Sequence, residues 1–153
     1  MIITTSFEVA APLADVWSQV LDVPTIAHCV PGAELTEVVD DRTYAGKIEV
    51  KLGPIAVAYR GRLRIEAVDD AAHEVRLRAE GNESRGRGGA SATVTASLRE
   101  VDGRTAVTMA SDVAVTGIVA QFGRSAIMQE VAQRMAQRFA SCLEQELRTS
   151  PTE

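Results

Sequence analysis

One long two-faced helix near the C-terminus constrains the fold of this chain more than any other feature. From Ile127 onward the apolar residues recur at the three- and four-residue spacing of a single helical face. They are Ile127, Met128, Val131, Met135, Phe139, Cys142 and Leu143. The opposite side carries the polar residues Glu130, Arg134, Gln137, Ser141 and Glu144. A helix from Gly117 to Leu147 would be about 45 Å long, so a broad surface must lie beneath it.

Gly123 interrupts this helix near its start. On a helical wheel Ile118, Val119 and Phe122 point roughly 100° or more away from the later stripe, and glycine is the residue at which a helix bends most easily. The pattern therefore predicts that residues 118–122 form a separate apolar turn. Two alternatives remain open: a mobile turn, or a turn that packs on the last strand.

Before the helix, the hydrophobic period changes to two. Alternation predicts a first strand from Ile3 to Val9, a short helix from Leu13 to Leu21, and a meander of strands from Ala33 to Thr116. Turn sequences divide the meander at Gly53-Pro54, Asp69–His73, Ser84–Gly89 and Asp102-Gly103. We therefore expect an α+β fold in which a curved antiparallel sheet of six to seven strands surrounds the C-terminal helix, with short helices after the first strand.

The inward rows of these strands contain unusually small residues. They are Gly46, Gly61, Ala79, Gly81, Ala90, Ala92, Ala96 and Ser111. A sheet and a helix about 10 Å apart normally need large side chains to reach interior packing density. The sequence therefore predicts a hydrophobic cavity that holds an apolar ligand. The alternative is a tightly bent sheet with the helix closer to it and a solid core.

Composition limits the class of protein further. The 153 residues fit one domain, predicted over residues 1–148, with 149–153 as the start of a polar linker. A net charge of -5 argues against nucleic acid as a partner. The N-terminus lacks the basic and apolar regions of a signal peptide, and no apolar run is long enough to span a membrane. Cys29 and Cys142 are interpreted as reduced thiols of a cytosolic protein, with a single disulfide left open.

The sequence offers no catalytic or metal-ligating motif. His28 and Cys29 are adjacent, so their side chains are expected to diverge, and no Cys and His spacing typical of a metal site occurs. The segment Ser84–Gly89 joins strand to strand, which differs from a phosphate-binding loop, and is predicted to be a flexible hairpin end. Its Arg85 and Arg87 could meet an acidic partner.

A basic patch is predicted on the outer face of the sheet. It consists of Arg60, Arg62, Arg64, Arg76 and Arg78. If the turn centres on Ala71, Arg64 faces Arg78 and Glu66 faces Arg76 across the hairpin. Like charges directly opposite, as at Arg64 and Arg78, are unfavourable. Anionic lipid head groups or an acidic protein surface would relieve them. The alternative is an ordinary solvated face.

Three segments resemble a known family. They are Val30-Pro31-Gly32-Ala33, the run GKIEVKLGPIAVAYRGRLRI within Tyr44–Ile65, and TGIVAQFGRSAIMQEVA from Thr116 to Ala132. In these residues the chain resembles the G-subunit family of carbon monoxide dehydrogenase, which belongs to the START-like, helix-grip (SRPBCC) superfamily. The resemblance covers about Ile2 to Leu147.

The resemblance implies a non-catalytic accessory role. Its partners would be a molybdenum-containing carbon monoxide dehydrogenase and the cytoplasmic membrane, with the protein peripheral at the inner face. Because quinones are too apolar to reach a cytosolic enzyme alone, a domain with an apolar cavity could present one to the dehydrogenase. We therefore expect a bound menaquinone or ubiquinone and no covalent cofactor.

The residues expected to line the ligand site come from the sheet and the long helix. They are Ile48, Val57, Tyr59, Met109, Val113, Met128, Val131 and Met135, with Phe122 as a gate. Methionine side chains adapt to an isoprenoid tail, and Tyr59 or Ser111 could bond a quinone carbonyl. Two other functions stay open: a cyclase or dehydratase using the same cavity, and a scaffold that only recruits the dehydrogenase.

Overall fold

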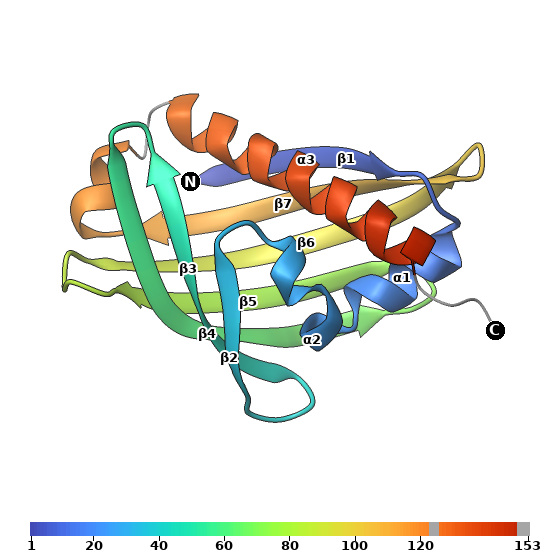
Figure 1. Cartoon of the computed structure of the whole chain (residues 1–153), viewed down its shortest axis with the longest axis horizontal. Coiled ribbons are helices and arrows are strands. Elements are labelled where there is room, and N and C mark those ends of the chain that lie inside the picture. Colours follow the sequence, from blue (N-terminus) through green and yellow to red (C-terminus); the bar gives the residue numbers. More distant parts are fainter. Residues whose placement is uncertain (123–125, 150–153) are drawn as a thin grey trace.

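One seven-stranded antiparallel sheet forms most of the protein, in the order β1-β7-β6-β5-β4-β3-β2 (Figure 1). The computed structural model describes residues 1–122 and 126–149. The strands are β1 (Ile2–Val9), β2 (Ala33–Val38), β3 (Thr43–Leu52), β4 (Ile55–Asp69), β5 (Glu74–Glu83), β6 (Gly89–Val101) and β7 (Arg104–Val115). The helical elements are α1 (Leu13–Val20), α2 (Val23–Ile26), η1 (Ala27–Cys29), η2 (Gly117–Phe122) and α3 (Ala126–Thr149). The predicted α+β fold class is confirmed, with seven strands.

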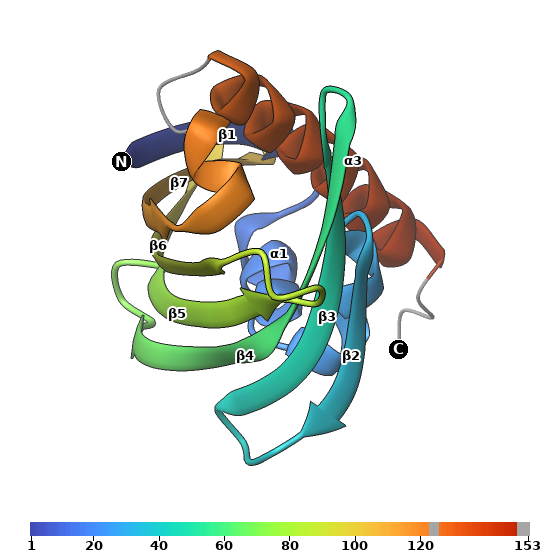
Figure 2. The same ribbon diagram turned by 90° about the vertical axis from the view of Figure 1, so that its left-hand side faces the viewer.

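The sheet curves strongly, and α3 lies across its concave side. Figure 2 shows β1 and β3, from the two sides of the sheet, both coming close to α3 while β4 and β5 curve away from it. The backbone of α3 follows β1 closely and approaches β3 and η1 at a few residues. The helix therefore rests on the rims of a curved sheet rather than on its centre.

Side-chain hydrogen bonds hold α3 to β1, which is an edge strand. Gln133 donates to the Ser6 carbonyl (2.8 Å) and accepts from the Ser6 amide (3.4 Å). Gln129 donates to the Thr4 carbonyl (2.8 Å). Glu144 Oε1 accepts a hydrogen bond from the amide of Ala10, the first residue beyond β1 (2.8 Å). These bonds occupy backbone groups that an edge strand leaves without a partner. Glu144, predicted on the solvated face, therefore turns towards β1 instead.

A row of glycines crosses the sheet where neighbouring strands approach most closely. Gly46 lies opposite Gly61, and Gly61 lies opposite Gly81. A Cβ atom on Gly61 would collide with the Glu80 carbonyl, and one on Gly46 would lie 2.6 Å from the Glu34 carbonyl. Glycine in a strand interior is typical of a sharp bend where another backbone comes near. The small inward residues therefore serve the curvature of the sheet as well as its interior volume.

We predict that Gly61→Ala lowers the free energy of unfolding by about 1–3 kcal/mol or more, because a backbone carbonyl must move to admit the methyl group. Gly81→Ala is the matched comparison, since its Cβ atom would lie 3.0 Å from the Arg60 carbonyl and needs a smaller shift. Urea unfolding of both variants measures the difference. Equal losses would contradict the close approach at Gly61.

Two apolar clusters form the core, at opposite ends of α3. The larger includes Phe7, Trp17 and Leu143 and packs α1 and the C-terminal half of α3 against the sheet. The smaller consists of Leu52, Val57 and Val119, with partly buried neighbours from β7, η2 and the start of α3. The apolar turn predicted at 118–122 is confirmed as η2, and it packs on the strands through Val119.

A disulfide between Cys29 and Cys142 joins η1 to α3 across 113 residues of sequence. The interpretation of Cys29 and Cys142 as reduced thiols was therefore wrong, and the structure has the disulfide that the sequence left open. The local sequence around each cysteine does not indicate this contact, because the contact depends on η1 and α3 packing next to each other in the fold. The last residues of the predicted linker, 150–153, lie outside the described residues.

Candidate ligand-binding site

On β3, β4 and β5 the inner face of the sheet is more accessible at the middle of the strands than at their ends. On β3, Tyr44 and Leu52 at the two ends are buried, whereas Ile48 and Val50 between them are only half-buried. On β4 and β5 the end residues Ile65, Val57, Val75 and Glu83 are buried, and the residues Leu63, Tyr59, Leu77 and Ala79 between them are half-buried. A filled core would show the opposite pattern, because its centre is farthest from solvent. The middle of the inner face on these three strands therefore stays partly accessible to solvent.

The predicted ligand-binding residues divide between the two clusters and this middle region. Val57, Tyr59, Met128 and Val131 belong to the smaller cluster, where Val57 is almost fully buried by protein neighbours. Met109 packs against the larger cluster.

Three predicted residues, Ile48, Val113 and Met135, are half-buried and lie in neither cluster as described. Ile48 lies opposite Tyr59 across the β3–β4 pairing, next to the smaller cluster. The side chain of Phe122, the predicted gate, lies outside the described residues. The fold therefore brings most of the predicted set to the concave side of the sheet.

A buried carboxylate that the sequence analysis did not single out organises one end of this region. Glu83 is 4% exposed, and its Oε1 accepts from Arg87 Nε (3.1 Å) and from the Arg85 amide (2.9 Å). Its Oε2 accepts from Arg87 Nη2 (3.2 Å). These bonds, above all those from the Arg87 side chain, lower the pKa of Glu83 from 4.5 to about 2. The alternation of β5 places Glu83 inward, which was the available sequence signal.

The same ion pair orders the loop between β5 and β6. Arg87 Nη2 donates to the Ala56 carbonyl (3.2 Å), and the Arg87 carbonyl accepts from the Ile118 amide of η2 (3.0 Å). Arg87 therefore meets an acidic group of its own chain and links the loop to β4 and η2. The segment predicted to be a flexible hairpin end is a hydrogen-bonded junction.

Tyr59 supplies a further polar atom on the inner face of the sheet. Its hydroxyl is buried and, within the described part of the chain, has no hydrogen-bond partner. Burial, and then the negative charge of Glu83, raise the pKa of Tyr59 above its ordinary value of 10, with Arg87 acting in the opposite direction. Tyr59 is therefore protonated at neutral pH, and its O–H group is an available donor.

We predict that Glu83→Gln removes an acid-dependent part of the stability. Because the folded pKa of about 2 lies below the ordinary 4.5, folding is favoured by ionised Glu83 above about pH 4.5, and this contribution is lost as pH falls towards 2. Urea unfolding between pH 2.5 and 7 should show a smaller decline with acid for the variant than for the parent. An identical decline would contradict the assignment.

The five arginines of the predicted basic patch lie on the outer face of β4 and β5. Arg64 faces Arg78, as predicted. Arg76 lies opposite Ala67 rather than Glu66, because a bulge between Ile65 and Ala67 shifts the register by one residue. Arg76 still forms an ion pair with Glu66 (3.6 Å), and Arg78 forms one with Glu80 (3.1 Å). Some of the like-charge repulsion is therefore relieved within the chain, and the role of the patch in binding a partner stays a prediction.

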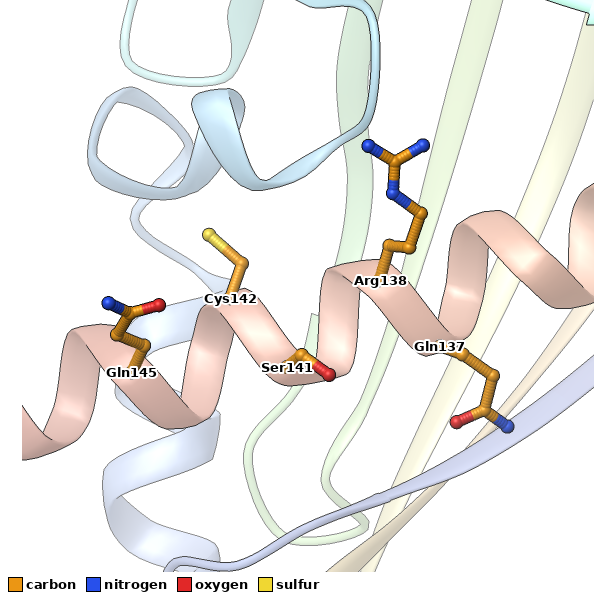
Figure 3. A pocket seen from close by; sticks show the side chains of 5 residues that line it. All are labelled: Gln137, Arg138, Ser141, Cys142 and Gln145. Atoms are coloured by element: carbon orange, nitrogen blue, oxygen red, sulfur yellow. The ribbon is translucent and has the colours of Figure 1, made fainter.

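Two surface hollows also lie among the described residues. One, of about 390 Å³, runs along α3 and is lined by Gln137, Arg138, Ser141, Cys142 and Gln145 (Figure 3). The other, of about 350 Å³, is lined by Ser6, Phe7, Glu8, Arg99, Ala106, Val107 and Thr108. Neither contains a predicted ligand-binding residue. Among the helices that the structure describes, none combines the length and apolar character needed to cross a bilayer.

A curved antiparallel sheet with a C-terminal helix across its concave side defines the helix-grip, START-like class. A conserved protein from Geobacillus kaustophilus is similar over 95% of this chain and 97% of its own, with a TM-score of 0.78 and 17% identity. The ZhuI aromatase/cyclase from Streptomyces sp. R1128 has a TM-score of 0.64 at 16% identity, with 97% and 96% covered. Norcoclaurine synthase from Thalictrum flavum also gives 0.64, at 14% identity, with 98% and 87% covered.

Within this class the family is defined by the sequence. The chain belongs to the CoxG family, the G subunit of carbon monoxide dehydrogenase, and the family model matches residues 5–148. A comparison with curated proteins finds no match. The members of this family are accessory subunits. The chain's membership of the family and its fold together fit a ligand-binding accessory role. The fold alone is shared with enzymes, as the cyclase and the synthase show.

Proposed function

We propose that this protein is a non-catalytic carrier that binds a respiratory quinone between the middle of the sheet and α3. The observation that supports this proposal is the partly accessible centre of the inner face. There, Ile48, Val113 and Met135 are half-buried and belong to neither apolar cluster of the described residues. When an apolar molecule covers apolar side chains that are accessible to water in the folded protein, the free energy of the system falls.

The chemistry of the middle region suits a quinone. Its inward residues are apolar except for Tyr59 and Ser111. An isoprenoid tail needs only apolar contact, which the aliphatic side chains and the methionines supply. A quinone head group adds carbonyl oxygens that accept hydrogen bonds, and the Tyr59 hydroxyl, which has no partner among the described residues, is a donor. One polar contact in an apolar site is typical of ligand recognition.

The titratable groups near this region do not favour an enzyme. Arg87 holds Glu83 ionised well below neutral pH, while burial holds Tyr59 protonated. A general acid or base works best with a pKa near the working pH, and the pKa of neither group is shifted in that direction. The cyclase-type alternative therefore lacks a catalytic residue among the described groups that line the middle of the sheet.

We further propose that the protein recruits a molybdenum-containing carbon monoxide dehydrogenase to the inner face of the cytoplasmic membrane. The family name associates the chain with this enzyme. The electrons from oxidised carbon monoxide would then reach the quinone without the quinone leaving an apolar environment. The basic patch on β4 and β5 is the candidate face for anionic lipid or for the dehydrogenase.

We predict that Val113→Trp reduces quinone capture at least about tenfold, because the indole would fill the space beside the middle of the sheet. Ala114→Trp is the matched control, since Ala114 is the next residue on β7 and is exposed on the opposite face. Each purified protein is incubated with menaquinone in detergent, separated from free ligand, extracted with solvent and quantified by mass spectrometry. Equal capture by both variants would overturn the proposed site. Failure of the unaltered protein to capture quinone would leave only the recruitment scaffold.

We predict that Tyr59→Phe weakens quinone affinity about fivefold, the loss of one hydrogen bond worth about 1 kcal/mol. Affinity for a hydrocarbon of the same tail length and without carbonyl groups should not fall. Competition between the two ligands, read by mass spectrometry, separates these effects. If the variant lost affinity for both ligands equally, Tyr59 would act through packing rather than through a hydrogen bond.

A further inference from the structure

Three potential metal ligands converge where η1 meets the C-terminal half of α3, and a carboxylate lies beside one of them. The Nε2 atom of His28 lies 2.8 Å from Glu146 Oε1 and 3.8 Å from Cys29 Sγ. The donor atoms of His28, Cys29 and Cys142 all lie within 4.8 Å of one another. The spacing along the chain did not indicate this group, because Cys142 and Glu146 are one helical turn apart on α3 while His28 and Cys29 belong to η1.

In the structure the two sulfur atoms are joined as a disulfide, and disulfide sulfurs are poor metal ligands because the thiolate is the ligating form. Reduction by a dithiol or a phosphine adds two electrons and two protons and yields two thiols. The change would leave a Cys₂His group with a carboxylate beside it. Such a donor set is typical of zinc rather than of magnesium or calcium, which prefer oxygen ligands.

One separation between ligand atoms of the group is already close to that in a tetrahedral zinc site. With Zn–S of about 2.3 Å and Zn–N of about 2.0 Å, a thiolate and an imidazole nitrogen on one zinc ion lie about 3.6 Å apart. His28 Nε2 and Cys29 Sγ are 3.8 Å apart, which is close to the separation that two ligand atoms of one zinc ion require. After reduction the two sulfurs need to move to about 3.8 Å from each other. Their Cα atoms are 5.3 Å apart, and rotation of the Cys142 side chain supplies the movement.

The ligands are accessible from solvent on two sides. The side chains of His28 and Glu146 are 58% and 33% exposed. Cys142 borders the open hollow along α3, and Figure 3 shows its side chain projecting from the helix towards the segment that carries α2 and η1. A reductant and a metal ion can therefore both reach the group without unfolding of the larger cluster, in which Cys29 is buried.

We propose that reduction of the Cys29–Cys142 disulfide converts this group into a zinc site, with Cys29, Cys142 and His28 as ligands and Glu146 as the fourth. On binding, each thiol loses its proton to solvent and the neutral imidazole carries its remaining proton on Nδ1, so two protons are released for each zinc ion. The metal then links η1 to α3 in place of the covalent bond. The site is independent of the proposed quinone carrier, because it lies in the larger cluster, away from Tyr59 and η2.

Cobalt(II) is a suitable probe, because thiolate ligation gives an intense charge-transfer absorption that carboxylate and imidazole ligation do not. The protein is reduced with a phosphine, freed of reductant without oxygen, checked for folding by circular dichroism, and titrated with Co²⁺ and then Zn²⁺. We expect one Co²⁺ per reduced chain with the thiolate absorption, displacement by one equivalent of Zn²⁺, and neither signal for the oxidised protein. A reduced, folded protein without the absorption, or equal binding by both redox forms, would overturn the proposal.

Two variants test the ligand assignment in the reduced state. His28→Ala should weaken Zn²⁺ binding at least about tenfold, as loss of a ligand or of its supporting contact does. Ser141→Ala is the matched control, because Ser141 neighbours Cys142 and lines the same hollow but lies outside the ligand group. The control should bind like the parent and show the same zinc-dependent rise in Tm. Unchanged affinity in the His28 variant would remove the histidine from the site and with it the four-ligand arrangement.

Discussion

The structure depends on where α3 is held. Glutamine side chains on its N-terminal half bond the backbone of β1 at Thr4 and Ser6, and Glu144 bonds the chain just beyond that strand. The C-terminal half of α3 packs into the larger apolar cluster, and the first turns of α3 pack against the smaller one. The contacts with β1 therefore both protect an edge strand and fix how α3 lies across the concave side of the sheet.

Much of the fold could be predicted because its signals are local. The alternation from Ala33 to Thr116 predicted the meander, and the break at Gly123 predicted the separate turn that is η2. The glycines and alanines of the inward rows left two alternatives, a cavity or a tightly bent sheet; the glycines do lie where strands approach each other closely, and the cavity stays a prediction. Local patterns did not predict the strand register where a bulge interrupts it. The bulge between Ile65 and Ala67 places Arg76 opposite Ala67 instead of opposite Glu66.

Long-range contacts could not be predicted from spacing. The disulfide and the histidine and glutamate beside it unite residues more than 100 positions apart, and neither local sequence contains a motif. The Glu83–Arg87 pair is short-range, yet its role depends on η2 and β4 arriving at the same loop. The predicted ligand-binding residues fall between these cases, because the strand pattern placed them inward but could not show which would be packed by neighbours.

The glycine row has a consequence for how such proteins diverge. Because Gly46, Gly61 and Gly81 let backbone meet backbone, the bend of the sheet is fixed by main-chain geometry and not by the side chains that face the interior. Those side chains can then be exchanged one at a time while the outline of the sheet is kept. A cyclase and a synthase that have the same fold at low sequence identity fit this expectation.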